Sequence, residues 1–138
     1  MQETMSRAVR TNAEDGSEDV FIVLCASGFD NISRVRSALM FASLAAVAHY
    51  RTILYCIQDA VDVMVRGAIE RSETQLPGAP SIAQRLREAM ATGVEIQCCT
   101  QTMANKKISA EDLLEGIKPA GAMNLIALTS GARGALCF

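Results

Sequence analysis

Two uninterrupted apolar runs of strand length constrain the fold of this 138-residue chain most strongly. They cover residues 20–25 and 52–57. A strand that is apolar on both faces must be covered on both faces, which is typical of a central strand in a parallel sheet. Apolar residues with helical spacing fill the segment between them, over 32–48. The order strand, helix, strand therefore predicts an α/β fold with right-handed crossovers.

The same alternation continues toward the carboxyl terminus. Ser81 and Gln84 have the spacing of a capping box, and Gly93 stands where a helix would end. Pro119 limits its strand to an edge or a strand end. The predicted strands cover 94–99, 117–119 and 135–138, and the predicted helices cover 82–92 and 120–129. Residues 20–138 are thus expected to form a single domain with a flavodoxin-like, doubly wound, mostly parallel sheet of four to five strands and helices on both faces.

Residues 1–19 differ from the rest of the chain. They are polar, contain Asn, Asp, Gly and Ser, and show no sustained hydrophobic periodicity. Such a segment buries too little apolar surface to offset the entropy of ordering it. We therefore expect a flexible N-terminal tail that precedes the folded domain.

Composition excludes several classes of protein. The net charge of −2 lacks the basic excess of a nucleic-acid-binding protein. The longest nearly uncharged run, 37–49, is shorter than the ~20 residues that a membrane-spanning helix needs, and the first residues contain no apolar signal segment. Five cysteines, an odd number without a secreted-scaffold spacing, favour free thiols. We expect a cytoplasmic protein with no membrane insertion and no nucleic-acid partner.

The segment 93–103 holds the strongest candidate for a chemical site. Alternation along its strand sends Cys98 to the face of its apolar neighbours and Cys99 to the face of Glu95 and Gln97. Cys99 also stands at the carboxyl end of the strand, where α/β proteins place reactive groups. A strained geometry disfavours a disulfide between the two, because neighbouring Cα atoms are only about 3.8 Å apart. Cys99 is therefore the candidate nucleophile, and Cys98 is a poor resolving partner.

The residues after Cys99 could activate it. A turn is expected directly after the strand, and backbone N–H groups of 100–102 that point at the sulfur would favour the thiolate. Lys106 or Lys107 could add positive charge. The alternative is that Cys99 is structural, as we expect for the cysteines at other strand ends, because cysteine is also a small hydrophobe. Those cysteines are Cys25, Cys56 and Cys137.

Other chemistries of cysteine and histidine have little support. No Cys-x-x-Cys pair is present, and no Arg stands where a cysteine phosphatase needs one. The single histidine, His49, is expected at the opposite edge of the sheet from Cys99, and the chain lacks four ligands with zinc spacing. Gly28 stands without the other glycines of a nucleotide-binding loop. We expect no cofactor and no metal.

Three segments resemble the DsrE/DsrF-like sulfur-relay family. The first two are Phe-Ile-Val-Leu-Cys-Ala-Ser-Gly-Phe-Asp at 21–30 and Ala-Leu-Met-Phe-Ala-Ser-Leu-Ala at 38–45. The third, Gly-Val-Glu-Ile-Gln-Cys-Cys-Thr-Gln-Thr-Met at 93–103, is similar to the family pattern Gly-Val-x-Ile-x-x-Cys-x-x-(Ser/Thr)-Met. In that match the family cysteine falls on Cys99. The resemblance covers about 20–138, and the third segment is its most specific part.

The resemblance implies a small cytoplasmic homo-oligomer, a trimer or a hexamer, that handles sulfane sulfur. Cys99 would carry a persulfide taken from a donor protein or small persulfide and passed to an acceptor. Lys106 or Lys107 would steer an anionic donor, and Cys98 and Gly28 are secondary candidates. The residues expected to stabilise thiolate and persulfide are Thr100, Gln101, Thr102 and Met103. Some members of the family have no functional cysteine, so the alternative is a non-catalytic subunit that assembles through its apolar helix at 38–47.

Overall fold

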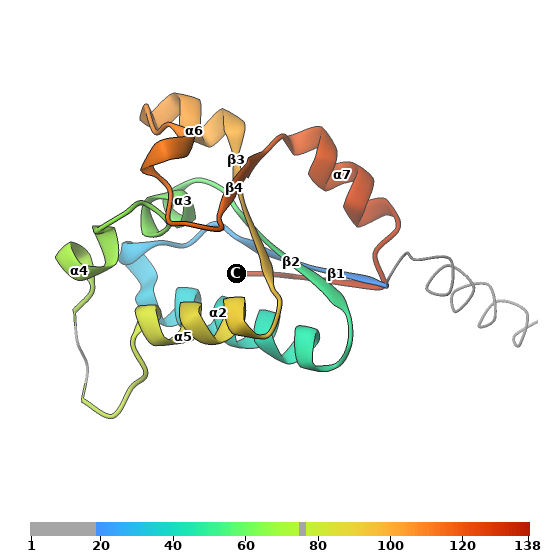
Figure 1. The fold of residues 1–138 in the computed structure, drawn as a ribbon, viewed down its shortest axis with the longest axis horizontal. Helices are drawn as coiled ribbons and strands as arrows, with labels where there is room; N and C mark the ends of the chain where they lie inside the picture. Colours follow the sequence, from blue (N-terminus) through green and yellow to red (C-terminus); the bar gives the residue numbers. More distant parts are fainter. Residues whose placement is uncertain (1–18, 75–76) are drawn as a thin grey trace, which may run out of the picture.

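The computed structural model describes residues 19–74 and 77–138. The tail expected over 1–19 therefore lies outside the described residues, apart from Asp19. The described chain forms an α/β fold around a five-stranded sheet with the order β4-β3-β2-β1-β5 (Figure 1). All neighbouring strands are parallel. The predicted fold class is confirmed.

Each strand corresponds to an apolar or alternating segment of the sequence. The two uninterrupted apolar runs form the central strands, and the proline-containing strand lies at an edge, as its missing N–H requires. The strands are β1 (Val20–Cys25), β2 (Arg51–Cys56), β3 (Glu95–Cys99), β4 (Lys118–Ala120) and β5 (Gly134–Cys137). Every cysteine in the chain thus lies at the carboxyl end of a strand, at one edge of the sheet.

Helices cover both faces of the sheet. Figure 1 shows α2 (Ile32–Val47) and α5 (Ile82–Ala91) together on one side and α7 (Ala122–Ser130) on the other. Shorter helices gather near the carboxyl edge of the strands: α3 (Asp59–Val63), α4 (Ala68–Ser72), α6 (Thr100–Lys106) and the 3-10 turns η1 (Phe29–Asn31) and η2 (Ala110–Asp112). None of the helices within 19–74 and 77–138 is long and apolar enough to cross a membrane.

The two faces of the sheet carry cores of different size. On the side of α2 and α5, the main core contains residues from β1, β2 and β3 and from helices α2 to α5. On the side of α7, a smaller core contains only Ile22, Ile53, Tyr55 and Cys99 as buried residues. Leu125 and Leu128 of α7 pack against it, but no residue of α7 is itself fully buried. One helix therefore covers this face incompletely.

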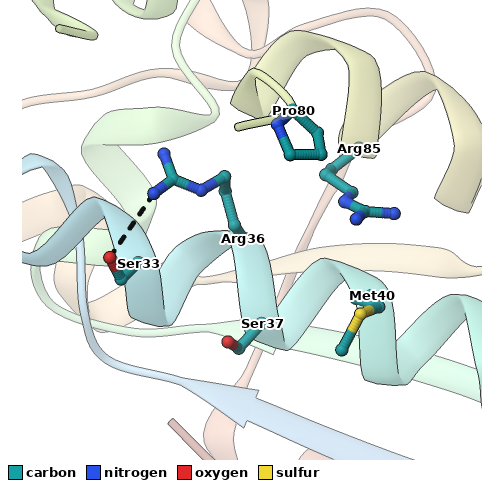
Figure 2. Close-up of a pocket in the computed structure, with 6 residues that line it drawn as sticks. All are labelled: Ser33, Arg36, Ser37, Met40, Pro80 and Arg85. Atoms are coloured by element: carbon teal, nitrogen blue, oxygen red, sulfur yellow. Dashed lines mark hydrogen bonds between the residues drawn. The ribbon is translucent and has the colours of Figure 1, made fainter. Parts of the chain in front are cut away.

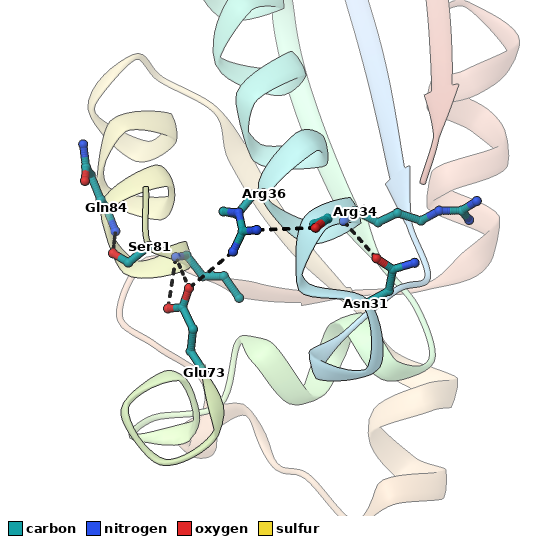
Figure 3. A network of polar contacts seen from close by, with 8 residues as sticks. Asn31, Arg34, Arg36, Glu73, Ser81 and Gln84 are labelled. Atoms are coloured by element: carbon teal, nitrogen blue, oxygen red, sulfur yellow. Dashed lines mark hydrogen bonds and ion pairs between the residues drawn. The ribbon is translucent and has the colours of Figure 1, made fainter. Parts of the chain in front are cut away.

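A buried carboxylate connects the helices on the main-core side. The Glu73 side chain is only 2% exposed and lies 3.9 Å from Arg36 of α2. Its two oxygens also accept from the backbone N–H of Ile82, the first residue of α5, at 3.0 and 2.8 Å. Figure 3 shows this network beside the cap of α5, where Ser81 accepts from the N–H of Gln84. Glu73 thus ties the end of α4 to α5 and α2.

Gly28 has a structural role at the carboxyl edge of the sheet. A Cβ atom at this position would collide with the backbone carbonyl of Asp59, at the start of α3. The loop after β1 can therefore approach the loop after β2 only without a side chain here. The Gly28 N–H donates to Asp30 Oδ1 at 2.9 Å, which fixes the loop further.

Candidate active site

Cys99 is the last residue of β3 and the N-cap of α6. The strand therefore passes directly into a helix, and the separate turn expected at 100–103 is in fact the first turn of α6. The first N–H groups of a helix have no partner within it. The first turn of α6 offers these groups at the point where β3 ends.

The side chains of Cys98 and Cys99 lie on opposite faces of the sheet. Cys98 belongs to the main core with Ile96, as predicted, and its exposure is 0%. Cys99 belongs to the smaller core under α7. The prediction of polar surroundings for Cys99 is wrong, because Ile53 and Tyr55 of β2 occupy the same face. Cys99 is consequently only 6% exposed.

Hydrogen bonds to the Cys99 sulfur outweigh the effect of its burial. Burial alone would raise the pKa of the thiol, but the net pKa is lowered from its ordinary value of 9.0. The donors are, in order of effect, the backbone N–H of Thr102, the hydroxyl of Tyr55, the hydroxyl of Thr102 and the backbone N–H of Gln101. Each favours the charged form of the thiol. A buried sulfur with these donors is suited to exist as a thiolate.

The hydroxyl of Thr102 is oriented by a strained residue. The Thr102 Oγ1 atom accepts from the backbone N–H of Gln58 at 3.2 Å, which leaves its own hydrogen free to donate to the sulfur. Gln58 has φ 50° and ψ −130°, a backbone conformation that side-chain-bearing residues rarely adopt. The strained backbone of Gln58, at the junction between β2 and α3, thus directs an N–H group at the Thr102 hydroxyl, which contacts Cys99.

Tyr55 is the residue of this site that the sequence did not reveal. It is 0% exposed, and its hydroxyl donates to the carbonyl oxygen of Ala120 at 2.8 Å. Burial raises the pKa of this phenol, and the hydrogen bond with Cys99 raises it further. A buried tyrosine needs a partner for its hydroxyl. That requirement, in a strand where Tyr55 stands between Leu54 and Cys56, was the available signal.

The other predicted site residues are divided between surface and core. Thr100 is exposed, whereas Met103 is 5% exposed and packs in the main core. Gln101 contributes its backbone N–H to the sulfur, while its side chain donates to Asn105 at 3.3 Å. Thr102 also borders a cavity of about 330 Å³, which is further lined by Gln58, Asp59, Asn105 and Lys106. The first turn of α6 therefore acts on the sulfur mainly through its backbone.

Lys106 is ion-paired with two carboxylates. Its Nζ atom lies 2.9 Å from Asp62 and 3.5 Å from Asp59, both on α3. The hydrogen bond with Asp62 is the main cause that raises the pKa of Lys106. One ammonium between two carboxylates leaves a local net charge of −1, so Lys106 offers little attraction to an anionic donor. Lys107 is exposed and ends α6 with φ 58°.

The pKa is raised at two of the other thiols, and at Cys25 burial outweighs the backbone hydrogen bond with Ser27 that lowers it. A hydrogen bond with the Cys98 thiol and burial hold the pKa of Cys56 well above 9.0, and burial raises that of Cys25. All five cysteines are free thiols. In the part of the chain that the structure describes, no group of three or more His, Cys, Asp or Glu side chains is placed to hold a metal ion.

A second cavity, of about 240 Å³, lies between α2 and α5 on the main-core side. Figure 2 shows Arg36 and Arg85 beside it, with Arg36 donating to Ser33 at 3.4 Å. Arg36 already faces Glu73, and Arg85 lies 3.2 Å from Glu88. Because each arginine has a carboxylate partner, this cavity has no excess positive charge with which to bind an anion.

Comparison with known proteins identifies the family. The DsrE/DsrF-like family model matches residues 19–138, which is most of the chain. The chain belongs to the DsrE/DsrF-like family. The resemblance found in the sequence is confirmed. No curated protein matches this DsrE/DsrF-like chain significantly.

Solved structures show the same fold. The YchN protein from E. coli has 21% identity and a TM-score of 0.69, covering 88% of this DsrE/DsrF-like chain and 100% of its own. MTH1491 from Methanobacterium thermoautotrophicum, described as of unknown function, has 18% identity, a TM-score of 0.62 and the same coverages. BT1422 from Bacteroides thetaiotaomicron, also of unknown function, has 14% identity and a TM-score of 0.60, covering 87% and 95%.

Proposed function

We propose that this protein is a sulfur carrier that binds sulfane sulfur as a persulfide on Cys99. The observation that supports it best is the environment of the Cys99 sulfur, where hydrogen-bond donors lower the thiol pKa despite burial. Membership in the DsrE/DsrF-like family is consistent with sulfur chemistry at this position. A thiolate is the reactive form of cysteine in thiol exchange.

The transfer is an exchange between sulfur atoms without net oxidation. The Cys99 thiolate attacks the outer sulfur of a donor persulfide, R–S–SH. A new S–S bond forms at Cys99, the S–S bond of the donor breaks, and its electron pair leaves with the donor thiolate, R–S⁻. An acceptor thiolate later attacks the outer sulfur on Cys99 and releases the Cys99 thiolate. The backbone N–H groups of Gln101 and Thr102 and the Thr102 hydroxyl stabilise that thiolate in both steps.

The same proposal includes a homo-oligomer, a trimer or a hexamer, acting in the cytoplasm with sulfur donors and acceptors as partners. Large apolar side chains are exposed on both sides of the sheet: Phe41, Leu44 and Val47 on α2, and Met123 and Ile126 on α7. Their exposures run from 39% to 78%. Contact between subunits would remove this apolar surface from water. Residues 20–138 would then be the assembling domain.

Incubation with a persulfide or polysulfide donor tests the carrier function. We expect the intact mass of the protein to increase by one sulfur atom at a time. Cys99→Ser should abolish the increase, and Cys98→Ser, the matched control one residue away, should retain it. Equal labelling of all five cysteines, or none at all, would contradict the proposal.

The second candidate is a non-catalytic subunit. The 6% exposure of Cys99 favours it, because a donor protein needs access to the sulfur. In that case Cys99 contributes to packing under α7, and assembly through α2 and α7 is the whole function. Sulfur loading of the wild-type protein separates the two candidates, since a packing cysteine gains no mass from the donor.

A further inference from the structure

Tyr55 places one hydroxyl hydrogen between two acceptors. Tyr55 is a residue of β2, and its hydroxyl donates to the carbonyl oxygen of Ala120 on β4, at 2.8 Å. Ala120 is the register partner of Cys99 in the pairing of β3 with β4. The Tyr55 side chain therefore crosses β3 at the level of Cys99, and Tyr55 and Cys99 pack in the same small core.

We propose that Tyr55 is a catalytic residue of the sulfur-transfer site, whose hydroxyl hydrogen moves from the Ala120 carbonyl to Cys99 Sγ when the thiolate forms. This inference rests on the carrier function proposed above. A phenol carries one hydrogen, so it donates to one strong acceptor at a time. A neutral thiol is a weak acceptor, and the Ala120 carbonyl holds the hydrogen. A thiolate is a charged acceptor, and charge-assisted hydrogen bonds are roughly twice as strong as neutral ones.

Burial makes the exchange effective. Tyr55 is 0% exposed, so bulk water does not compete for its hydrogen, and hydrogen bonds are stronger in such surroundings. Charged and titratable side chains on the surrounding elements are Cys25 on β1, Arg51 and Cys56 on β2, Glu95 and Cys98 on β3, Lys118 on β4, Lys106 on α6, and Asp59 and Asp62 on α3; α7 has none. Of these, Cys56 and Cys98 lie in the main core on the other face, and Lys106 is ion-paired.

The hydrogen follows the charge through both transfer steps. During loading, the Cys99 thiolate forms its new S–S bond, the donor thiolate leaves with the negative charge, and the Tyr55 hydrogen returns to the Ala120 carbonyl. During unloading, the acceptor thiolate bonds to the outer sulfur, the S–S bond to Cys99 breaks, and Sγ receives the electron pair. Tyr55 donates to Sγ as that charge develops, so it assists Cys99 as a leaving group.

The two steps respond in opposite directions when this hydrogen bond is removed. A less stabilised thiolate has a higher pKa and is a better nucleophile, but a poorer leaving group. Above the thiol pKa, the loading rate of Tyr55→Phe should therefore equal or exceed that of the wild type. Its unloading rate should be lower by a factor of about three or more. A purely structural role for Tyr55 would slow both steps together or neither.

The test is Tyr55→Phe, with Tyr50→Phe as the matched control, since the chain has two tyrosines. We expect Tyr55→Phe to raise the measured pKa of Cys99 by about one, the size expected for losing one charge-assisted hydrogen bond. Tyr50→Phe should leave that pKa unchanged. An unchanged Cys99 pKa in folded Tyr55→Phe would overturn the proposal, as would unloading at the wild-type rate.

Tyrosine absorbance gives a second readout that requires no substitution at Tyr55. The chain contains no tryptophan, so the near-ultraviolet spectrum reports its two tyrosines. Titrating Cys99 should perturb this spectrum in the wild type and in Tyr50→Phe, but not in Cys99→Ser. A spectrum that does not change as Cys99 ionises would overturn the proposal even if Tyr55→Phe failed to fold. Both readouts use the unloaded thiol, so they remain decisive if Cys99 carries no persulfide and the proposed function is wrong.

Discussion

Cys98 and Cys99 are neighbours in sequence and lie in different surroundings. Cys98 is buried in the main core, where the nearby Cys56 thiol is its hydrogen-bonding neighbour. Cys99 is nearly as buried, but hydroxyl and N–H donors contact its sulfur. On the main-core side the pKa of Cys56 is raised, and on the α7 side that of Cys99 is lowered. Donors, rather than exposure, distinguish the two faces of the sheet.

The largest expected difference between the two faces is in stability. Leu39 of α2 is 0% exposed in the main core, so Leu39→Ala should lower the free energy of unfolding by about 2–5 kcal/mol. Leu125 of α7 is only partly buried, and Leu125→Ala should cost about 1 kcal/mol. Denaturant unfolding measures both. Equal losses would show that the α7 face is as well packed as the main core.

The next largest difference is expected in the alkylation rates of Cys99 and Cys56. With limiting iodoacetamide at neutral pH, Cys99 should react at least about tenfold faster than Cys56, because only the thiolate is alkylated. Peptide mass spectrometry follows each cysteine separately, and Cys98 serves as the control for position on β3. Alkylation of Cys56 as fast as that of Cys99 would contradict the lowered pKa of Cys99, because Cys56 is also the less exposed of the two, at 0% against 6%.

The Thr102 hydroxyl should account for part of this difference. Thr102→Val removes a donor to the sulfur and should raise the pKa of Cys99 by about one or less. Thr102→Ser keeps the hydroxyl and is the matched control. The pH dependence of the alkylation rate measures the change. Equal pKa values in the two variants would assign the effect to the backbone N–H groups and the Tyr55 hydroxyl.

Lys106 should have the smallest effect. Its charge is balanced by Asp59 and Asp62, and its Nζ is not among the donors to the sulfur. Lys106→Gln should therefore leave the Cys99 pKa unchanged and should change the loading rate with an anionic polysulfide donor by less than about twofold. A large drop in loading would restore the steering role that the sequence suggested.

The sequence predicted the fold well because its signals are local. The apolar runs at 20–25 and 52–57, the helix end at Gly93 and the position of Pro119 each constrain the backbone directly. The alternation at 94–99 also predicted that Cys98 and Cys99 face opposite sides. The partners of Tyr55 and of Lys106 could not be predicted, because these contacts join residues more than 40 positions apart. The prediction of polar surroundings for Cys99 was wrong for the same reason.

The proposed function depends on the ionisation of Cys99, which a pH titration of its thiol measures. The ultraviolet absorbance of the thiolate, measured in the wild type and corrected with Cys99→Ser, should show a midpoint below 9.0. Because the pKa is lowered on folding, Cys99 should also stabilise the folded protein at pH values above the unfolded pKa, and this contribution should be lost as the pH falls through the folded pKa. A midpoint at or above 9.0 would show instead that burial outweighs the donors, and it would contradict a thiolate at Cys99.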